Sequence, residues 1–513
     1  MNGAEALLRT TVAGGVDLCL ANPGTTEMPL VAALDSVRGI RTVLGLFEGV
    51  CTGAADGYAR MAGRPALTLL HLGPGFANGI ANLHNARRAR SPLLNVVGDQ
   101  ASWHRAWDAP LTSDIESLAR PVSGWVETSS SAEGLAADTA RALAATSRSP
   151  AQVATLVVPV DCQWGEAPSG PAASTAARAA DAAPAERVMQ AATRMRAGRA
   201  AVLLGGKALR EPALRAAARA ASATNAALFC ETFPARIERG RGLPKLTRLP
   251  YFPEQAAEAL SSFELVLLAG APEPVAFFGY PDGVSRLARE ETLFSLASPG
   301  EDALASLEAL ADALDAPRQL PIAAEPETPS APRGPLDPAT LGAVLAARQP
   351  EGAVLVDEGA TSGGPWWVLA DAAAPHSTLT LTGGAIGQGL PCATGAALAR
   401  PETPVIALQA DGSAFYTLQA LWTQAREGLH VVTVLCANRR YRILQIEMAR
   451  AGIAEPGPAA GSLTDLRHPT PDWVALARGF GVPGTRVETA EELDRALAAA
   501  LAEAGPHLIE ALL

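Results

Sequence analysis

The length, composition and charge of the chain limit what it can be. Its 513 residues exceed what one hydrophobic core can hold and predict several domains. No apolar run approaches the roughly 18 residues needed to cross a bilayer, and the net charge of −11 argues against nucleic-acid and anionic-membrane partners, which require a basic surface. The beginning, MNGAEALLRTTVAGG, lacks the apolar core and cleavage site of a secretory signal, so we expect a soluble, cytoplasmic protein.

Short apolar, β-branched runs alternate with Ala-rich helical stretches along the chain, a pattern typical of parallel βαβ units. In the first third these runs end in Gly, Pro, Asn or Asp, where loops are expected: VDLCLANPG, RTVLGLFEG, PALTLLHLG and SPLLNVVGD. Because ligands of open parallel sheets bind at the carboxyl ends of the strands, we expect the chemistry in the loops that follow these runs.

Two segments divide the chain. Residues 166–186 and 316–338 are rich in Ala, Pro and Ser and lack a periodic apolar face, so both are predicted to be linkers. They separate three expected α/β domains, at residues 1–165, 187–315 and 339–513.

The last domain contains the clearest local signal for a ligand site. A predicted strand ends in Asp411, Gly412 and Ser413, a helix follows, and the next predicted strand ends in Asn438. Parallel order returns Asn438 to the sheet edge that holds Asp411, where carboxylate, amide, carbonyl and phosphate oxygens together suit Mg²⁺. The helix start at Gly412 and Ser413 offers backbone N–H groups to a diphosphate. Taken alone, D-G-S is also an ordinary turn, so the residues themselves leave both interpretations open.

The same stretch resembles the diphosphate motif of thiamine diphosphate (ThDP) enzymes, usually G-D-G-S followed after the same interval by N-N. In the first domain, LANPGTTEMPL and GLFEGVCTGAADGYARMAGRPA resemble the pyrimidine-binding domain of acetolactate synthases and benzoylformate decarboxylases. The resemblance continues in LHLGPGFANGIANLHNARRARSPLLNVVGD and covers nearly the whole chain. It implies an α/β fold of three doubly wound parallel-sheet domains: pyrimidine-binding, central and diphosphate-binding.

In the first domain the resemblance implies three catalytic residues. Glu48 matches the carboxylate that contacts the pyrimidine ring nitrogen of ThDP and assists proton removal from the cofactor. His71 matches an active-site histidine of benzoylformate decarboxylases, and Thr25 a small hydroxyl residue that touches the substrate carboxylate there. Without the resemblance, Glu48 is a common helix-start acid and His71 a packed strand-end histidine.

In the last domain the resemblance implies the remaining cofactor contacts. TLTGGAIGQGLPCATG looks like the segment that bends the cofactor, with Ile386 as the apolar prop and Gly384 allowing close backbone approach to the pyrimidine. Ala360 and Thr361 match a loop that helps hold the diphosphate, together with Asp411, Gly412 and Ser413. The implied metal ligands are Asp411, Asn438 and the carbonyl oxygen of Arg440.

The sequence also departs from the family pattern. Ala410 replaces the first Gly of G-D-G, and Ala437 and Arg439 replace the usual Asn and Gly beside Asn438. Ala at position 410 is tolerable only if φ is negative, so a slightly shifted loop is expected. A second histidine expected in the central domain is missing, and Phe277 and Phe278 stand at or beside its place. Slower proton delivery would follow, which favours reaction with a second carbonyl compound.

The resemblance implies an acetolactate synthase-like enzyme, a ThDP-dependent 2-oxo acid decarboxylase and carboligase. Ylide addition to a 2-oxo acid, loss of carbon dioxide and transfer to a second carbonyl compound would be its reaction. The alternatives are a benzoylformate decarboxylase-like enzyme that does not ligate and a non-catalytic ThDP-fold binding protein. A dinucleotide-dependent oxidoreductase is disfavoured because no phosphate-binding glycine fingerprint is present.

The expected cofactors are ThDP and Mg²⁺, while FAD is not expected because the central domain lacks resemblance to the flavin-binding signature. The cofactor of the resembling family bridges the first domain of one chain and the third domain of its partner. We therefore expect a homodimer or homotetramer with shared active sites.

Overall fold

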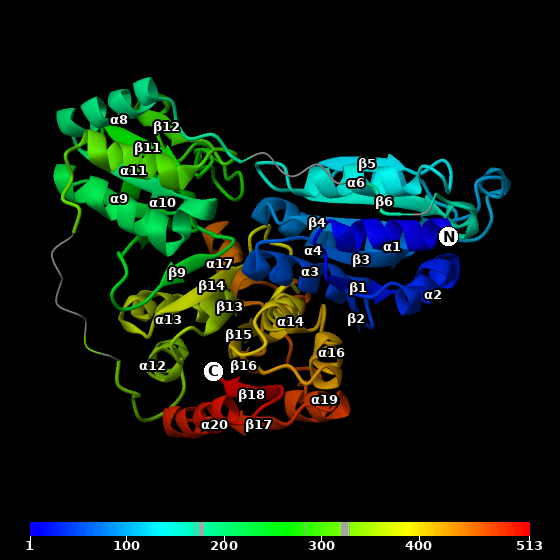
Figure 1. Cartoon of the computed structure of the whole chain (residues 1–513). Helices are drawn as coiled ribbons and strands as arrows, with labels where there is room; N and C mark the ends of the chain where they lie inside the picture. The colour runs from blue at the N-terminus through cyan, green and yellow to red at the C-terminus, as the bar shows by residue number, and fades with distance from the viewer. Residues whose placement is uncertain (169, 174–178, 282, 320–326, 328) are drawn as a thin grey trace. The chain divides into compact units, whose positions relative to one another are not determined.

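The computed structural model describes the whole chain except residues 169, 174–178, 282, 320–326 and 328. The chain forms two compact units (Figure 1). The first unit combines an N-terminal region, residues 1–177, with a C-terminal region, residues 328–374 and 379–513; the central unit contains residues 178–327 and 375–378. Parts of both predicted linkers lie outside the described residues, so the domain boundaries stay a prediction. No described helix is long and apolar enough to span a membrane.

The N-terminal region is built on a parallel sheet with the strand order β2-β1-β3-β4-β6-β5. Its strands are β1 (Leu18–Asn22), β2 (Arg41–Leu44), β3 (Ala66–His71), β4 (Leu93–Asp99), β5 (Trp125–Thr128) and β6 (Val153–Pro159). Its helices are α1 (Gly3–Ala13), η1 (Thr25–Glu27), α2 (Met28–Ser36), α3 (Glu48–Ala62), α4 (Leu72–Ala89), η2 (Arg105–Trp107), α5 (Ile115–Ala119), α6 (Leu135–Thr146) and α7 (Val160–Trp164). The central strands β3, β4 and β6 are buried almost throughout, which explains their continuous apolar runs.

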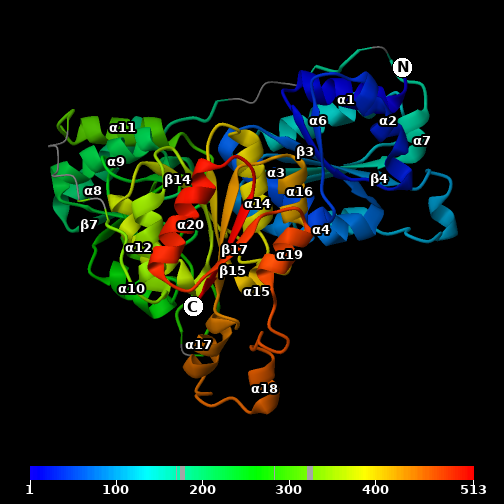
Figure 2. The same cartoon turned by 90° about the horizontal axis from the view of Figure 1, so that it is seen from below.

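The C-terminal region has a second sheet, in which β17, β18, β16, β15 and β13 run parallel in that order and β14 follows β13. Its strands are β13 (Val354–Glu358), β14 (His376–Thr380), β15 (Val405–Ala410), β16 (Val431–Ala437), β17 (Gly484–Val487) and β18 (His507–Leu512), although the first three residues of β14 are counted with the central unit. Its helices are α12 (Pro338–Arg348), η5 (Ala360–Ser362), α13 (Gly364–Leu369), η6 (Ala370–Ala372), α14 (Gly389–Ala399), α15 (Asp411–Ala414), α16 (Ala420–Arg426), α17 (Arg442–Arg450), α18 (Pro458–Ser462), α19 (Trp473–Gly479) and α20 (Ala490–Ala502). Helices α17 and α18 extend from this region as an arm (Figure 2).

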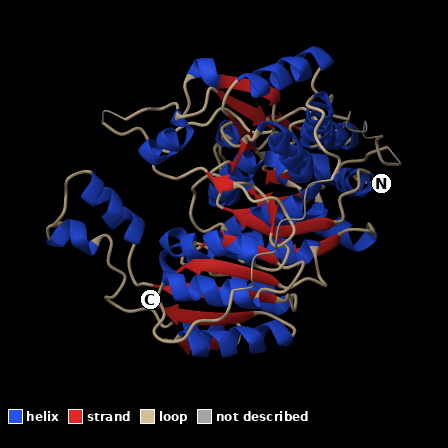
Figure 3. Cartoon of the chain, turned by 90° about the vertical axis from the view of Figure 1, so that its left-hand side faces the viewer, coloured by secondary structure: helices blue, strands red, loops and turns tan. Residues whose placement is uncertain are grey.

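The central unit contains a third parallel sheet, with the strand order β10-β8-β7-β11-β12. Its strands are β7 (Ala200–Leu204), β8 (Ala227–Cys230), β10 (Thr247–Arg248), β11 (Leu265–Ala269) and β12 (Leu293–Ala297), with a short β9 (Ile237–Arg239) outside this sheet. Its helices are α8 (Ala185–Ala197), η3 (Gly206–Leu209), α9 (Glu211–Thr224), α10 (Pro253–Ser261), η4 (Glu290–Thr292) and α11 (Ala303–Ala313). Strands and helices form layers in each part of the chain (Figure 3). The predicted fold class of three doubly wound parallel-sheet domains is confirmed.

Helices α3 and α14 join the N-terminal and C-terminal regions into one unit. Glycine allows them to approach closely: a Cβ at Gly57 would lie 2.1 Å from the carbonyl oxygen of Cys392, and one at Gly395 would lie 1.8 Å from that of Ala54. A continuous hydrophobic cluster includes side chains of both helices. Any larger residue at either glycine would force the helices apart, an overpacking cost of about 1–3 kcal/mol.

Candidate active site

Three predicted site residues of the N-terminal region follow neighbouring strands. Thr25 follows β1, Glu48 follows β2, and His71 ends β3. Because these strands are parallel and adjacent in the order β2-β1-β3, the three residues lie at the same carboxyl edge of the sheet. Ligands of such sheets bind at this edge, so the location suits a functional site.

Glu48 is the first residue of α3, and its side chain is buried, with 7% of the residue exposed. Its Oε2 atom accepts a hydrogen bond from Nδ2 of Asn78 at 2.9 Å. A Cβ at Gly75 would lie 3.1 Å from Oε1 of Glu48, so the first turns of α4 leave room for this carboxylate. The carboxylate is therefore held in place by α4, a contact that the motif did not reveal.

His71 is held by a carboxylate that sequence reasoning missed. Its Nδ1 atom lies 2.8 Å from Oε2 of Glu27, a fully buried residue at the end of η1. The Glu27 carboxylate also accepts hydrogen bonds from the Thr26 hydroxyl at 2.6 Å and the Gly24 N–H at 2.7 Å. A carboxylate so close to Nδ1 favours the tautomer with the proton on that nitrogen, which leaves Nε2 to exchange a proton with a ligand.

The hydroxyl that contacts His71 belongs to Thr26, whose Oγ1 lies 3.2 Å from Nδ1. Thr25, the residue predicted to touch the substrate carboxylate, is exposed one position earlier. Both follow β1 at the same sheet edge, so the substrate role of Thr25 stays a prediction.

The predicted metal ligands come together at the carboxyl edge of the second sheet. Strands β15 and β16 are paired in parallel, with Ala410 opposite Cys436, so Asp411 and Asn438 emerge side by side. The Asp411 carboxylate is buried and accepts the N–H groups of Gly412 at 2.8 Å and Arg439 at 2.6 Å.

The Ser413 hydroxyl is engaged inside the protein. It accepts a hydrogen bond from Gln409 and donates one to the carbonyl of Ala410. Because the hydroxyl is already hydrogen-bonded, Ser413 would contribute to diphosphate binding through its backbone N–H.

The residues at this edge fit a magnesium diphosphate. Among the described residues, no group of three or more His, Cys, Asp or Glu side chains could hold a metal ion. One carboxylate, one amide oxygen and one carbonyl oxygen, from Asp411, Asn438 and Arg440, are hard ligands that phosphate oxygens would complete. A cavity of about 680 Å³ beside them is lined by Arg439, Arg440 and Arg442 among others, and Nε of Arg439 is buried without a hydrogen-bond partner. This basic lining suits an anion.

Burial has the largest effect on the pKa of Asp411. Burial raises its pKa, while the backbone N–H groups of Arg439 and Gly412 act in the opposite direction. A bound cation would act in the same direction as these N–H groups and favour the ionised carboxylate.

The backbone is strained beside several predicted site residues. Leu72, next to His71, has φ of 51°, Ala360 has φ of 48°, and Arg439 has φ of 57°. The left-handed region costs a non-glycine residue roughly 1–2 kcal/mol, and such strain is often found at functional sites. By contrast Ala410 has φ of −76°, which meets the condition under which alanine can replace the usual glycine.

The other predicted cofactor residues lie in two loops of the C-terminal region. Ala360 and Thr361 begin η5, directly after β13. Gly384, with φ of 76°, and the partly exposed Ile386 lie between β14 and α14. Among the described residues, no hydrogen bond or ion pair joins Glu48 to the predicted metal and diphosphate ligands of this region.

In the central unit Phe277 and Phe278 stand where a histidine was expected. They are 38% and 54% exposed and stack edge-on, with ring centroids 4.8 Å apart. Phe277 also packs edge-on against Phe233 and forms a tilted ring pair with Tyr251. The unit therefore presents an aromatic cluster, and residues 178–327 contain no histidine.

The two parallel sheets, with Glu48 and Asp411 at their carboxyl edges, fit the class of enzymes that bind thiamine pyrophosphate. Residues 1–118 match the family model described as "Thiamine pyrophosphate enzyme, N-terminal TPP binding domain", and residues 366–511 match the corresponding "C-terminal TPP binding domain". The chain belongs to the ThDP-dependent enzymes of the acetolactate synthase and benzoylformate decarboxylase family.

Three relatives show how far the similarity extends. The chain is 51% identical to a Mycobacterium tuberculosis protein named "Putative acetolactate synthase large subunit IlvX", covering 99% of this chain and 98% of that protein. It is 31% identical to benzoylformate decarboxylase of Pseudomonas aeruginosa, covering 97% and 96% of the two chains. Its structure superposes on the ThDP-dependent 4-hydroxybenzoylformate decarboxylase of Rhodococcus jostii RHA1 with a TM-score of 0.88 at 26% identity, covering 99% and 98%.

Proposed function

We propose that the protein is a ThDP- and Mg²⁺-dependent enzyme that cleaves the bond next to the ketone of a 2-oxo acid, releases carbon dioxide and joins the remaining fragment to a second carbonyl compound. The observation that carries the ligation step is the replacement of the expected central histidine by Phe277 and Phe278 in an exposed aromatic cluster. Slow protonation after carbon dioxide leaves gives a second carbonyl compound time to react.

Residues of both the N-terminal and the C-terminal region would contribute to cofactor binding and to the reaction. ThDP, when bound, supplies the carbon nucleophile and the electron sink of the reaction. Glu48, held by Asn78, holds or moves a proton at the pyrimidine nitrogen. Asp411, Asn438 and the Arg440 carbonyl hold Mg²⁺, which neutralises the diphosphate.

The remaining cofactor residues position ThDP. Backbone N–H groups at Gly412 and Ser413, with Ala360 and Thr361, bind the diphosphate oxygens. Gly384 would allow close backbone approach to the pyrimidine, and Ile386 would be the apolar residue that supports the bend of the cofactor.

A second candidate is a decarboxylase that releases an aldehyde. The observation in its favour is the pair formed by His71 and the buried Glu27, because an oriented imidazole is suited to deliver a proton to the substrate fragment. Thr25, at the same edge, would bind the substrate carboxylate in either reaction.

Product analysis distinguishes the two candidates. The protein is incubated with ThDP, Mg²⁺ and either pyruvate or benzoylformate, and carbon dioxide and the organic product are measured together. We expect acetolactate or another 2-hydroxyketone. Free aldehyde as the only product would contradict ligation and support the second candidate, and no carbon dioxide from a panel of 2-oxo acids would contradict both.

We further propose a homodimer or homotetramer, acting without FAD in the cytoplasm, in which each active site combines Glu48 of one chain with Asp411 of another. Two inactive variants test this arrangement, Glu48→Gln and Asp411→Ala. A mixed dimer would contain one site with both changes and one with neither, so activity should return after subunit exchange. Confirmed exchange without any return of activity would rule out shared sites.

A further inference from the structure

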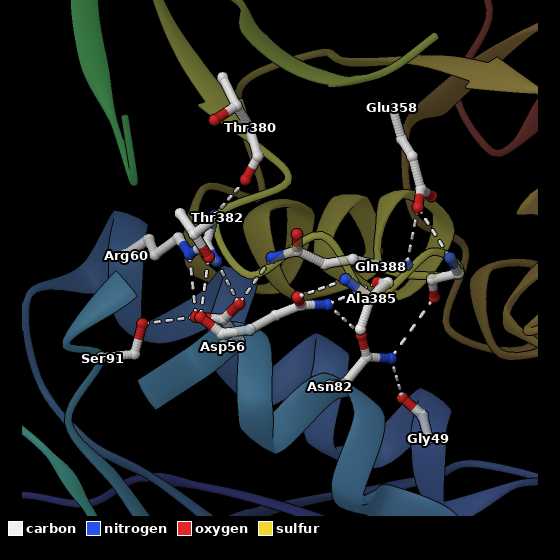
Figure 4. Close-up of polar contacts among 12 residues, drawn as sticks. Gly49, Asp56, Arg60, Asn82, Ser91, Glu358, Thr380, Thr382, Ala385 and Gln388 are labelled. Carbon is white, nitrogen blue, oxygen red and sulfur yellow. Dashed lines mark hydrogen bonds and ion pairs between the residues drawn. The ribbon is translucent and has the colours of Figure 1, made fainter. Parts of the chain in front are cut away.

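The loop between β14 and α14 carries Gly384 and Ile386, the residues predicted to support the cofactor bend. We call Thr382–Gly389 the bend loop. Side chains from both the N-terminal and the C-terminal region bind its backbone, and part of this network is drawn in Figure 4. The loop therefore depends on residues far away in the sequence for its conformation.

On the side of the N-terminal region, Asn85 of α4 holds Ala385 through both of its backbone groups. Nδ2 of Asn85 donates to the carbonyl of Ala385 at 2.7 Å, and its Oδ1 accepts the Ala385 N–H at 3.2 Å. Asn85 is fully buried. Because Ala385 lies between Gly384 and Ile386, this double hydrogen bond fixes the centre of the loop.

Helix α3 holds the two ends of the loop through a buried ion pair. Asp56 and Arg60 contact each other at 2.5 Å, and their side chains are 0% and 2% exposed. Arg60 donates to the hydroxyl of Thr382 at 2.9 Å, and Asp56 accepts from Nε2 of Gln388 at 2.7 Å (Figure 4). The carbonyl of Gly383 receives a further contact, from His84 at 3.1 Å.

On the side of the C-terminal region, Glu358 binds the end of the loop. Its carboxylate accepts the backbone N–H groups of Gly387 at 2.7 Å, Gln388 at 3.3 Å and Gly389 at 2.6 Å. Burial raises the pKa of Glu358, and these hydrogen bonds, with one from Gln409, act in the opposite direction. The Glu358 carboxylate and the backbone N–H groups of the bend loop therefore stabilise each other.

The pattern of these contacts is selective. Every residue from Thr382 to Gly389 takes part in one of them except Gly384 and Ile386. Within the described part of the chain, the backbone groups of these two residues form no hydrogen bond. These contacts hold the residues between and around Gly384 and Ile386, so the backbone groups of these two residues are available to a ligand.

We propose that Asn85 and Glu358 are positioning residues that hold the bend loop from opposite sides, so that Gly384 and Ile386 meet the pyrimidine end of the cofactor in a fixed geometry. The proposal rests on the cofactor contacts given under the proposed function. A purely structural role would lower stability without a preferential effect on the pyrimidine end of the ligand.

Binding measurements separate the two roles. Calorimetric titration in the presence of Mg²⁺ compares ThDP with inorganic pyrophosphate, which lacks the rings. We expect the ratio of the two dissociation constants to shift against ThDP by tenfold or more in Asn85→Leu and in Glu358→Gln. The circular dichroism of bound ThDP, which reports the relative orientation of its rings, should also change.

Two matched controls remove buried polar groups elsewhere. Asn95 is fully buried and bonds Thr155 at 2.9 Å, and Glu510 is buried and bonds Arg486 at 2.8 Å. Asn95→Leu and Glu510→Gln should lower stability but leave the ratio and the spectrum unchanged.

If Asn85→Leu does not fold, the smaller change Thr382→Val tests the same loop. Thr382→Val removes the hydroxyl that accepts from Arg60 and donates to the carbonyl of Asn85 at 2.7 Å. We expect a shift of about threefold in the ratio. Wild-type ratios and spectra in all three folded variants would overturn the positioning role, whereas a wild-type protein without Mg²⁺-dependent ThDP binding would overturn the proposed function instead.

Discussion

The two ends of the proposed cofactor site are built differently. In the N-terminal region, each reactive side chain is oriented by another side chain: Glu48 by Asn78 and His71 by Glu27. In the C-terminal region, the Asp411 carboxylate is oriented by the backbone N–H groups of Gly412 and Arg439. The comparison teaches that isosteric side-chain changes should damage the first end, whereas the second end depends on charge and backbone geometry.

The largest effect is expected at the diphosphate end. Asp411→Ala removes the only carboxylate among the proposed metal ligands, so the diphosphate loses the cation that neutralises it. We expect Mg²⁺-dependent ThDP binding to be abolished, as measured by calorimetric titration. Asp472→Ala, which changes an exposed aspartate of the same region, is the control and should bind normally. Unchanged affinity in Asp411→Ala would place the metal elsewhere.

Glu48→Gln tests the pyrimidine end with an isosteric change. The amide oxygen can still accept the hydrogen bond from Asn78, so the fold and ThDP binding should persist. Because the amide cannot exchange a proton, turnover should fall by roughly 10²- to 10⁴-fold. Activity near the wild-type level with the best substrate would refute a catalytic role for this carboxylate.

Glu27→Gln should have a smaller effect, because it acts through His71. Loss of the carboxylate at 2.8 Å leaves the imidazole free to adopt the other tautomer. We expect kcat to fall by about 10- to 100-fold, the scale seen when a partner that orients a reactive side chain is removed. Steady-state kinetics checks this, and an effect confined to KM would mean that His71 only binds substrate.

The smallest effect concerns backbone strain. Arg439→Gly relieves a left-handed conformation and should raise the free energy of unfolding of the apoprotein by about 0.5–1 kcal/mol. The neighbouring Arg440→Gly is the control: its φ is not in the left-handed range, so added chain entropy should lower stability. Urea unfolding measures both. Equal changes in the two variants would show that strain at Arg439 is negligible.

The sequence predicts the fold class and the location of the motifs well, because β-branched runs that end in Gly, Asn or Asp mark parallel strands directly. The sequence also predicts that Ala410 must have a negative φ, and the structure has it at −76°. Glu27 and Glu358 escaped prediction because their roles depend on strand order. Glu27 meets His71 only because β1 and β3 are neighbours, and Glu358 reaches Gly387 only when α14 lies over its strand.

The close packing of α3 on α14 also governs how the chain acquires its structure. Gly57 and Cys392 approach each other across more than half of the sequence, so this contact closes a very long loop. Contacts of such high sequence separation form slowly, because the entropy of loop closure is lost before packing compensates. During synthesis the glycine face of α3 stays uncovered until α14 has been made, while the intervening central unit has its own sheet and core. The packing of the N-terminal region is thus complete only when α14 docks on α3.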